Sequence, residues 1–293
     1  MNAETPAPPS VVAIGGGQGL SATLRALRRL PVEPVAVVSV ADDGGSTGRL
    51  RAASERVAPG DLRKSLVALA EGESPLREVM EHRFASGELE GHSFGNLLLA
   101  AFEESSGSVT GALEKVSQLL GVRGRVLPAT ADPVELVAEL EDGSVVVGQA
   151  LISSTPGVAR VSLEPLPTAC PEVVEAISEG AAVVLGPGSL YTSVLASAAI
   201  PDVRDALGET PAPVVYVCNL GPQAHETDGY DVAAHVAALH RHGIEPDVVL
   251  YDPDRIGGTG GVDGLLAAPM AADGTRVHDP DLLAAALGAA LQL

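Results

Sequence analysis

Several short apolar runs in this chain end in a glycine-rich or acidic turn, and segments with helical periodicity follow. Residues 11–14 meet Gly15 and precede an amphipathic segment at 21–30, after which a second apolar run covers 35–41. This order of strand, turn, helix and strand is the βαβ unit, whose two strands lie parallel in one sheet. We therefore expect an α/β fold with a doubly wound, Rossmann-like, mainly parallel sheet. After residue 170 the alternation returns, with expected helices at 171–178, 190–199, 232–240 and 282–291 and expected strands at 181–185, 214–218 and 248–251.

Two segments depart from this alternation. Residues 61–120 have mostly helical spacing, which predicts a helical wall beside the sheet. Residues 122–170 contain two β-branched runs around an Asp-Gly turn and a further run at 158–163, which predict a hairpin and another strand. We predict a single domain over residues 11–293 that includes a β-rich insertion at 122–170, preceded by a flexible tail at 1–10.

The charge balance argues against several classes of partner. The chain has 38 acidic and 18 basic residues, which gives a net charge of −20. A nucleic-acid-binding surface needs clustered Lys and Arg to neutralise phosphates, and an anionic membrane attracts basic segments. The sequence has no apolar run of about 18 residues, the length at which a segment could span a bilayer. We therefore expect neither nucleic acid nor a membrane as partner.

Cysteine usage and the first residues predict a cytoplasmic location. Cys170 and Cys218 have no second cysteine or histidine at metal-ligand spacing, and this usage fits a reducing compartment. Residues 1–10 contain neither a basic segment nor an apolar segment, so they do not predict a signal peptide. We expect a soluble chain in the cytoplasm.

Two glycine-rich turns, each between an expected strand and an expected helix, are candidates for phosphate binding. Glycine lets the backbone approach a phosphate closely, and the free amides at the start of the helix then point at it. A tight turn that needs positive φ would explain fewer glycines than the four in five positions at the first turn. Two such turns in one chain suggest a diphosphate, or a phosphate joined to a sugar. The first turn contributes Gly15, Gly16, Gly17, Gly19, Leu20 and Ser21, and the second contributes Gly186, Pro187, Gly188, Ser189, Tyr191 and Thr192.

An acidic turn with Asp42 and Asp43 follows the second expected strand. Open α/β sheets place ligands at the carboxyl ends of their strands. Adjacent carboxylates are costly there unless a cation or hydrogen-bond donors satisfy them, and Mg²⁺ bridged to substrate phosphates suits such a site. The alternative is an Asp that only caps the loop. Asp42 and Asp43 are thus the candidate catalytic residues and Mg²⁺ ligands. The residues expected beside the ligand in this turn are Gly44, Gly45, Ser46 and Arg49.

Three further motifs carry polar residues whose roles the sequence leaves open. Asp61 and Arg63 lie at the start of an expected helix, where Asp61 could bind the ligand or cap the helix. His92, Ser93 and Asn96 open an apolar helix and could donate to phosphate or sugar, although Ser93 could equally be a helix cap. The last motif suits hydroxyl or base recognition, or forms a polar loop, and it contains Asn219, Glu226, Thr227 and Asp228.

Six segments taken together resemble one family. They are GGGQGLS at 15–21, ADDGGSTGRLR at 41–51, PGDLRKSLVALA at 59–70, GHSFGNLLLAA at 91–101, LGPGSLYTSV at 185–194, and CNL at 218–220 with ETDGYD at 226–231. In this order and spacing the chain resembles the bacterial gluconeogenesis factor (YvcK-like) family, which is related to the 2-phospho-L-lactate transferases of deazaflavin coenzyme biosynthesis. Gln18 in place of Thr and Phe94 in place of Leu are small departures from the family pattern.

The resemblance implies a Rossmann-like protein that binds UDP-sugars, notably UDP-N-acetylglucosamine, with a cytoplasmic role in cell shape and cell-wall supply during gluconeogenic growth. The transferase relatives imply instead an enzyme that uses Mg²⁺ to move a phospholactyl-type group from a guanylyl donor. The close fit of GDLRKSLVALA and ETDGYD favours the first alternative. A nicotinamide-dependent oxidoreductase is disfavoured and no NAD is expected, because Leu20 stands where the dinucleotide fingerprint has its last Gly. We also expect a homo-oligomer, with no interface that the sequence identifies.

Overall fold

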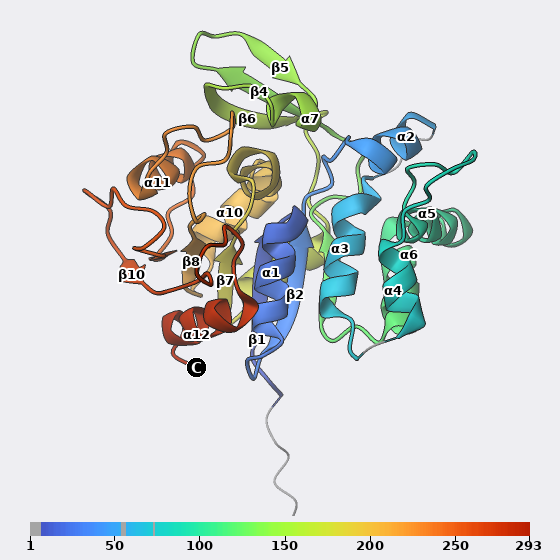
Figure 1. Ribbon diagram of the computed structural model, residues 1–293, viewed down its shortest axis with the longest axis horizontal. Coiled ribbons are helices and arrows are strands. Elements are labelled where there is room, and N and C mark those ends of the chain that lie inside the picture. The colour runs from blue at the N-terminus through green and yellow to red at the C-terminus, as the bar shows by residue number, and fades with distance from the viewer. Residues whose placement is uncertain (1–6, 54–56, 73) are drawn as a thin grey trace, which may run out of the picture.

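The main sheet of the protein is parallel, and helices connect and cover its strands, as the sequence predicts. The structure is a computed structural model that describes residues 7–53, 57–72 and 74–293 (Figure 1). Within these ranges the main sheet has seven strands in the order β10-β9-β8-β7-β1-β2-β3, all paired in parallel. The strands are β1 (Ser10–Gly15), β2 (Glu33–Val38), β3 (Arg125–Pro128), β7 (Ala182–Leu185), β8 (Val214–Val217), β9 (Val248–Tyr251) and β10 (Leu265–Ala267).

The strand order creates a switch point between β1 and β7. The chain runs outward from β1 to β2 and β3, then returns to β7 on the other side of β1 and runs outward again through β8 and β9. β1 and β7 pair in register from Val11 opposite Ala182 to Ile14 opposite Leu185. Their carboxyl ends, and the turns that follow them, therefore open at one place. Open α/β sheets bind ligands at such a switch point.

Helices cover the sheet and wall its β3 side. In Figure 1, α1, α3 and α12 lie on the face toward the viewer, and α1 packs against both of the others. The predicted wall consists of α3 to α6 beside β2 and β3. The main helices are α1 (Gly17–Leu27), α2 (Gly45–Ala53), α3 (Pro59–Leu69), α4 (Pro75–Glu81), α5 (Phe94–Ser106), α6 (Val109–Leu120), α8 (Pro171–Glu179), α9 (Leu195–Ala198), α10 (Pro201–Glu209), α11 (Val232–Arg241) and α12 (Pro280–Leu291).

The predicted β-rich insertion is a small antiparallel sheet above the carboxyl edge of the main sheet (Figure 1). Its strands β4 (Glu135–Leu140), β5 (Val145–Val147) and β6 (Val158–Glu164) follow the order β5-β4-β6, and α7 (Gln149–Ile152) lies between β5 and β6. Its predicted start at residue 122 is too early, because β3 pairs with β2 as the edge strand of the main sheet. Its sequence has only Val126 and Leu127 between Arg125 and Pro128, so it lacks the continuous apolar run that predicts the strands at 181–185 and 248–251.

Aliphatic side chains build most of the central strands, and Tyr216 of β8 is buried among them. Val12, Ile14, Val37, Val183 and Val215 are completely buried, which is the pattern of parallel strands covered on both faces. Within the described ranges, no helix is both long and apolar enough to cross a membrane. Of the tail predicted at 1–10, residues 1–6 lie outside the described residues, and Ser10 already begins β1.

Candidate functional site

The two glycine-rich turns meet at the switch point. A Cβ placed on Gly19 would lie 2.1 Å from the carbonyl oxygen of Pro187 and 2.6 Å from Cα of Gly188, so only glycine permits this approach. A buried hydrogen bond of 2.8 Å from Thr23 Oγ1 to the carbonyl of Gly186 ties α1 to the second turn. Asn219 holds the same turn through both ends of its side-chain amide. Gly188 N donates to Oδ1 at 3.0 Å, and Nδ2 donates to the Gly188 carbonyl at 2.9 Å. Asn219 therefore positions the turn.

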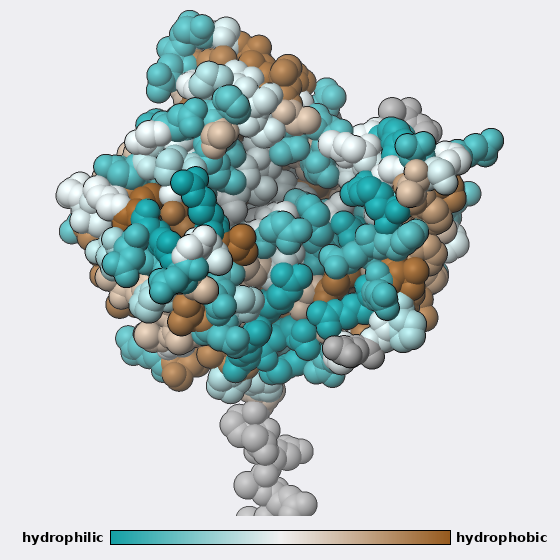
Figure 2. All heavy atoms as spheres, viewed as in Figure 1, coloured by the Kyte–Doolittle hydropathy of each residue, from teal (hydrophilic) through white to brown (hydrophobic). Residues whose placement is uncertain are grey.

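A polar cleft of about 360 Å³ opens where these turns meet. Its walls come from the first glycine turn, from Asp42, Asp61 and Lys64, and from the second turn with Glu226. Gln149 and Ser153 of the insertion form its upper rim, and the space-filling view shows the surface hollowed below the insertion (Figure 2). Four of the motifs that the sequence singles out, together with Asp61, thus share one cleft.

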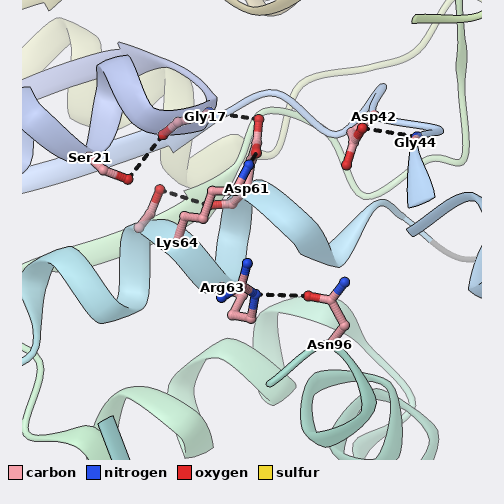
Figure 3. Close-up of polar contacts among 9 residues, drawn as sticks. Gly17, Ser21, Asp42, Gly44, Asp61, Arg63, Lys64 and Asn96 are labelled. Carbon is pink, nitrogen blue, oxygen red and sulfur yellow. Dashed lines mark hydrogen bonds and ion pairs between the residues drawn. The ribbon is translucent and has the colours of Figure 1, made fainter. Parts of the chain in front are cut away.

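Asp61 occupies the amino end of α1. Its Oδ2 accepts from Gly17 N at 2.8 Å, and its Oδ1 accepts from Lys64 Nζ at 2.8 Å (Figure 3). A carboxylate there is stabilised by the positive end of the α1 dipole. Asp61 is therefore not the cap of its own helix, which begins at Pro59 after Ala58. Beside it, Ser21 Oγ donates to the Gly17 carbonyl at 3.0 Å, while the side chain of Leu20 is buried in the core.

Asp42 is the second carboxylate of the cleft. Gly44 N donates to its Oδ1 at 3.1 Å, and the Thr47 hydroxyl donates to the same carboxylate. Burial raises the pKa of Asp42, and the neighbouring charge of Asp61 raises this pKa further. A cation between these two side chains would relieve that repulsion.

Asp43 does not face the cleft, which corrects the expectation of an adjacent acidic pair. Its Oδ1 accepts from Ala150 N in α7 at 2.8 Å, so this carboxylate fastens the insertion above the switch point. The residue follows Asp42 in the loop between β2 and α2, where the two carboxylates have different partners, Gly44 N for Asp42 and Ala150 N for Asp43. The pair that shares the cleft is therefore Asp42 with Asp61.

The expected helix-wall residues build a support behind the cleft. Ser46 Oγ lies 3.2 Å from His92 Nδ1 and accepts from Asn96 Nδ2 at 3.2 Å, and Ser93 caps α5 by accepting from Asn96 N at 3.3 Å. Arg63 Nε donates to Asn96 Oδ1 at 3.1 Å (Figure 3).

The two arginines expected near the acids are used elsewhere. Arg49 donates to the Glu90 carbonyl at 2.8 Å, and Arg63 contacts Asn96 and the Met80 carbonyl. The ion pair with Asp61 comes from Lys64, whose Nζ lies 2.8 Å from Asp61 Oδ1. The sequence offered one signal for Lys64, its spacing of three residues from Asp61 on a helix, which puts both side chains on one face.

Glu226 occupies the amino end of the helix after β7. Its Oε1 accepts from Tyr191 N at 2.8 Å and from Thr192 N at 3.0 Å, and Ser189 Oγ donates to its Oε2. The first turn of that helix, η1 (Leu190–Val194), is a π-helix, a form that is frequent at functional sites. This amino end was expected to be an open phosphate cradle, but an internal carboxylate already accepts from its amides.

The remaining predicted residues serve the local structure. The Tyr191 hydroxyl lies 2.8 Å from that of Tyr230, and both are outside the cleft. Thr227 is fully buried and its Oγ1 accepts from Gln223 N at 2.8 Å. Asp228 is exposed and accepts from His225 N at 3.0 Å. Gly45 has a φ of 48° and starts α2, and Gly15 has a φ of 155° at the end of β1.

The transferase resemblance implies Mg²⁺, and the carboxylates of the cleft that would hold such an ion are Asp42 and Asp61. Within the described ranges no group of three or more His, Cys, Asp or Glu side chains could hold a metal. Mg²⁺ is commonly held by one or two carboxylates together with substrate phosphates and water. The two carboxylates therefore fit a metal that arrives with a phosphorylated ligand, and do not fit a cage made by the protein alone.

Comparisons with known proteins agree with the fold and the motifs. A family model described as 2-phospho-L-lactate transferase CofD matches residues 11–270. The "Gluconeogenesis factor" of Halalkalibacterium halodurans is 44% identical over 248 residues, which cover 83% of this chain and 77% of that protein. The "Putative gluconeogenesis factor" of Deinococcus radiodurans is 45% identical over 303 residues, which cover 94% of this chain and 65% of that protein.

The chain matches less than two thirds of two of these relatives. The matched part is 65% of the Deinococcus radiodurans protein and 51% of a relative from Nostoc sp.. A crystal structure of a member of the UPF0052 family from Bacillus halodurans has a TM-score of 0.90 and 37% identity, covering 97% of this chain and all of that chain. The fold is thus shared along nearly the whole chain.

Proposed function

We propose that this chain, which belongs to the family of 2-phospho-L-lactate transferase CofD and the bacterial gluconeogenesis factors, binds a nucleotide diphosphate sugar in the cleft at the switch point. The preferred ligand is UDP-N-acetylglucosamine. The observation that carries the proposal is the contact between Gly19 and the Pro187–Gly188 turn, which joins both glycine turns into one polar cleft.

The donors that remain open in the cleft suit a diphosphate. Gly17 N is taken by Asp61, and the amides of Tyr191 and Thr192 are taken by Glu226. The other first-turn amides of α1 have no partner inside the helix, because the first four N–H groups of any helix lack one. These amides and the Lys64 ammonium are the donors for phosphate oxygens, while Asp42 is an acceptor for sugar or ribose hydroxyls or a ligand for Mg²⁺.

The cellular role that we propose is that of a cytoplasmic sugar-nucleotide sensor for cell shape and cell-wall supply during gluconeogenic growth. The support for this role is family membership together with a cleft of acid-rich, hydroxyl-recognising character. We also propose that the chain forms a homo-oligomer. Light scattering that gives a 29.6 kDa monomer at micromolar concentration would contradict this.

UDP-N-acetylglucosamine is expected to bind with a dissociation constant in the micromolar range, about −7 to −9 kcal/mol. Isothermal titration calorimetry measures this directly, and thermal shift with UDP-N-acetylglucosamine, GDP and NAD compares the three ligand classes. NAD is the negative control because the dinucleotide fingerprint is incomplete. Absence of heat at millimolar UDP-N-acetylglucosamine, with binding of GDP instead, would favour a transferase.

That transferase is the second candidate, and the shared cleft position of Asp42 and Asp61 is the observation that favours it. Asp42→Asn is expected to weaken binding of the Mg²⁺ nucleotide by about 1–3 kcal/mol, because a charged partner is lost from a buried site. Asp43→Asn is the matched control and is expected to change affinity by less than about 0.5 kcal/mol, since Asp43 faces Ala150.

Product analysis separates binding from catalysis. In a transferase, an acceptor hydroxyl would form the new bond to phosphorus and a nucleoside monophosphate would leave. Release of nucleoside monophosphate from a labelled donor by the wild type, dependent on Mg²⁺ and lost in Asp42→Asn but kept in Asp43→Asn, would replace the sensor by an enzyme. Mg²⁺ would act there as a Lewis acid on the phosphate oxygens.

A further inference from the structure

Helix α5 is apolar on every side, but only one side of it is buried. From Phe94 to Phe102 its residues are apolar except for Asn96. A helix that is apolar all round is normally buried all round. In this helix only Gly95, Asn96 and Leu99 are buried, on the side that packs against α3, α4 and α6. Figure 1 shows α5 at the outer end of the helical wall, so an apolar surface stays partly open to solvent there.

The hairpin that leads into α5 adds aromatic side chains to this surface. Arg83 and Ser93 form an antiparallel bridge, and Phe94 N donates to the His82 carbonyl at 2.9 Å. Side chains alternate along an extended segment and opposite residues share a face, so His82, Phe84 and Phe94 lie on one side of the hairpin. The His82 and Phe84 rings meet edge to face, with their centroids 5.3 Å apart.

The phenylalanines of the chain gather in this hairpin and helix. There are three of them, Phe84, Phe94 and Phe102, and none is buried. The buried aromatic side chains of the described residues are instead Tyr191 and Tyr216. Phenylalanine is usually a core residue, and aromatic side chains on a surface are enriched where two proteins meet. Their position therefore indicates a protein interface.

One stripe along α5 continues the aromatic surface of the hairpin. Phe94, Leu97 and Ala101 follow one another at spacings of three and four residues, which places them on one side of the helix. Phe94 and Leu97 are half-buried, and Ala101 is exposed. Together with His82 and Phe84 these residues form what we call the α5 face. Figure 2 shows hydrophobic side chains along the edge of the molecule where α4 to α6 lie.

We propose that the α5 face binds the same face of a second copy of this chain, with the two α5 helices antiparallel about a two-fold axis near Leu97. A two-fold contact uses one patch on both subunits, so that patch must fit itself. Phe94 and Ala101 are two helical turns apart on either side of Leu97, so each large ring lies opposite a small side chain of the partner copy. The inference rests on the homo-oligomer part of the proposed function and does not depend on the ligand.

The charges along α5 fit the antiparallel arrangement. Glu103 and Glu104 lie near the carboxyl end, and the first turn of α5 has no acidic residue. The amino end of a helix carries a partial positive charge. In an antiparallel pair the acidic end of each helix lies beside the amino end of the other, whereas a parallel pair brings the acids together. A net charge of −20 opposes contact between two copies over most of the surface, so an apolar face with this charge pattern is the favoured place.

Ala101→Glu is expected to raise the dissociation constant of the dimer at least about tenfold, because it buries an unpaired carboxylate against Phe94 of the partner copy. Ala101 is exposed in the single chain, so the substitution leaves the fold intact. The matched control is Ala285→Glu, at an exposed alanine of α12, which lies across the molecule from α5 in Figure 1. Sedimentation velocity over the micromolar range measures the dissociation constants, and the control is expected to match the wild type.

Cross-linking shows which surface the second copy occupies. Leu97 lies near the proposed axis, so two Leu97→Cys thiols are neighbours, and diamide as the oxidant is expected to join them in an intermolecular disulfide. The native Cys170 and Cys218 are buried and do not compete. Ala285→Cys is the control and is expected to stay unlinked. Non-reducing electrophoresis separates the linked dimer from the 29.6 kDa chain.

The outcomes separate the interface from the rest of the proposed function. A wild type that is a 29.6 kDa monomer throughout the micromolar range overturns the homo-oligomer and the α5 face together. A wild-type dimer whose dissociation constant is unchanged in Ala101→Glu, or whose Leu97→Cys variant forms no disulfide, overturns the α5 face alone. Neither residue lines the cleft, so both variants are expected to bind UDP-N-acetylglucosamine as tightly as the wild type.

Discussion

Gly19→Ala is expected to lower the free energy of unfolding by about 3 kcal/mol and to reduce nucleotide binding at least tenfold, because overpacking by one methyl group in a rigid contact typically costs about 1–3 kcal/mol or more. The added Cβ would lie 2.1 Å from the Pro187 carbonyl oxygen and 2.5 Å from its carbonyl carbon. Both are backbone atoms, so no side-chain rotation relieves the contact. The two turns must separate, which widens the cleft at the point where they meet.

The matched control for this change is Gly208→Ala. Gly208 lies near the end of α10, and a Cβ placed on it would meet no atom within 4 Å. Alanine is a better helix former than glycine by about 0.8–1.0 kcal/mol, so this variant is expected to be as stable as the wild type or slightly more stable. Denaturant unfolding measures both variants, and calorimetry with UDP-N-acetylglucosamine measures binding. A Gly19→Ala protein with wild-type stability and affinity would show that the turns do not touch.

The meeting of the two glycine turns could be predicted from the sequence. Glycine clusters after the strands at 11–14 and 181–185 lie at the carboxyl ends of parallel strands, and a doubly wound sheet has a switch point at which two such ends are neighbours. Each of these strands is a short, continuous aliphatic run that ends at a glycine, and this pattern was sufficient to locate it. The strand at Arg125–Pro128 escaped prediction because its apolar run is only Val126 and Leu127 and because it lies at the sheet edge, where its first residue is exposed.

The partner of Asp42 could not be predicted. Asp43 is adjacent in sequence, but its carboxylate accepts from the Ala150 amide, 107 residues away, and this long-range contact turns it from the cleft. Asp61 comes from α3, and its approach to Asp42 depends on how α3 packs against α1. Residue type and spacing identify which groups are polar, whereas tertiary packing decides which of them share a cleft.

The carboxylates that accept hydrogen bonds from the amino ends of α1 and η1 could not be predicted from the sequence for the same reason. An open α1 or η1 amino end and one that already meets a carboxylate have the same local sequence. Asp61 lies 44 residues from Gly17, and Glu226 lies 35 residues from Tyr191. Lys64 was overlooked because a lysine on a predicted helix is ordinarily a solvent-exposed charge. Here it is half-buried and donates to Asp61.

Glu226→Ala is expected to lower the free energy of unfolding by about 2–3 kcal/mol, since hydrogen bonds to a charged group contribute about 1.5–3 kcal/mol and water from the cleft replaces the lost acceptor only in part. The variant removes the acceptor of the Tyr191 and Thr192 amides, while the Ser189 hydroxyl keeps the Thr192 hydroxyl as a hydrogen-bond partner. Glu226→Gln keeps an acceptor oxygen for the two amides, so its expected loss is nearer 1 kcal/mol. Asp228→Ala removes an exposed carboxylate of the same loop and is expected to cost about 0.5 kcal/mol, as measured by denaturant unfolding.

Rescue by an anion shows whether the Glu226 carboxylate holds a helix amino end. Removing the carboxylate from Glu226→Ala exposes the amides of Tyr191 and Thr192 to the cleft, and free amides at a helix amino end bind phosphate. Millimolar inorganic phosphate should then raise the melting temperature of Glu226→Ala more than that of the wild type or Asp228→Ala. The same amides should exchange hydrogen rapidly in Glu226→Ala and slow down when phosphate is added. If phosphate stabilises all three proteins equally, Glu226 contributes to packing and not as an internal substitute for an anion.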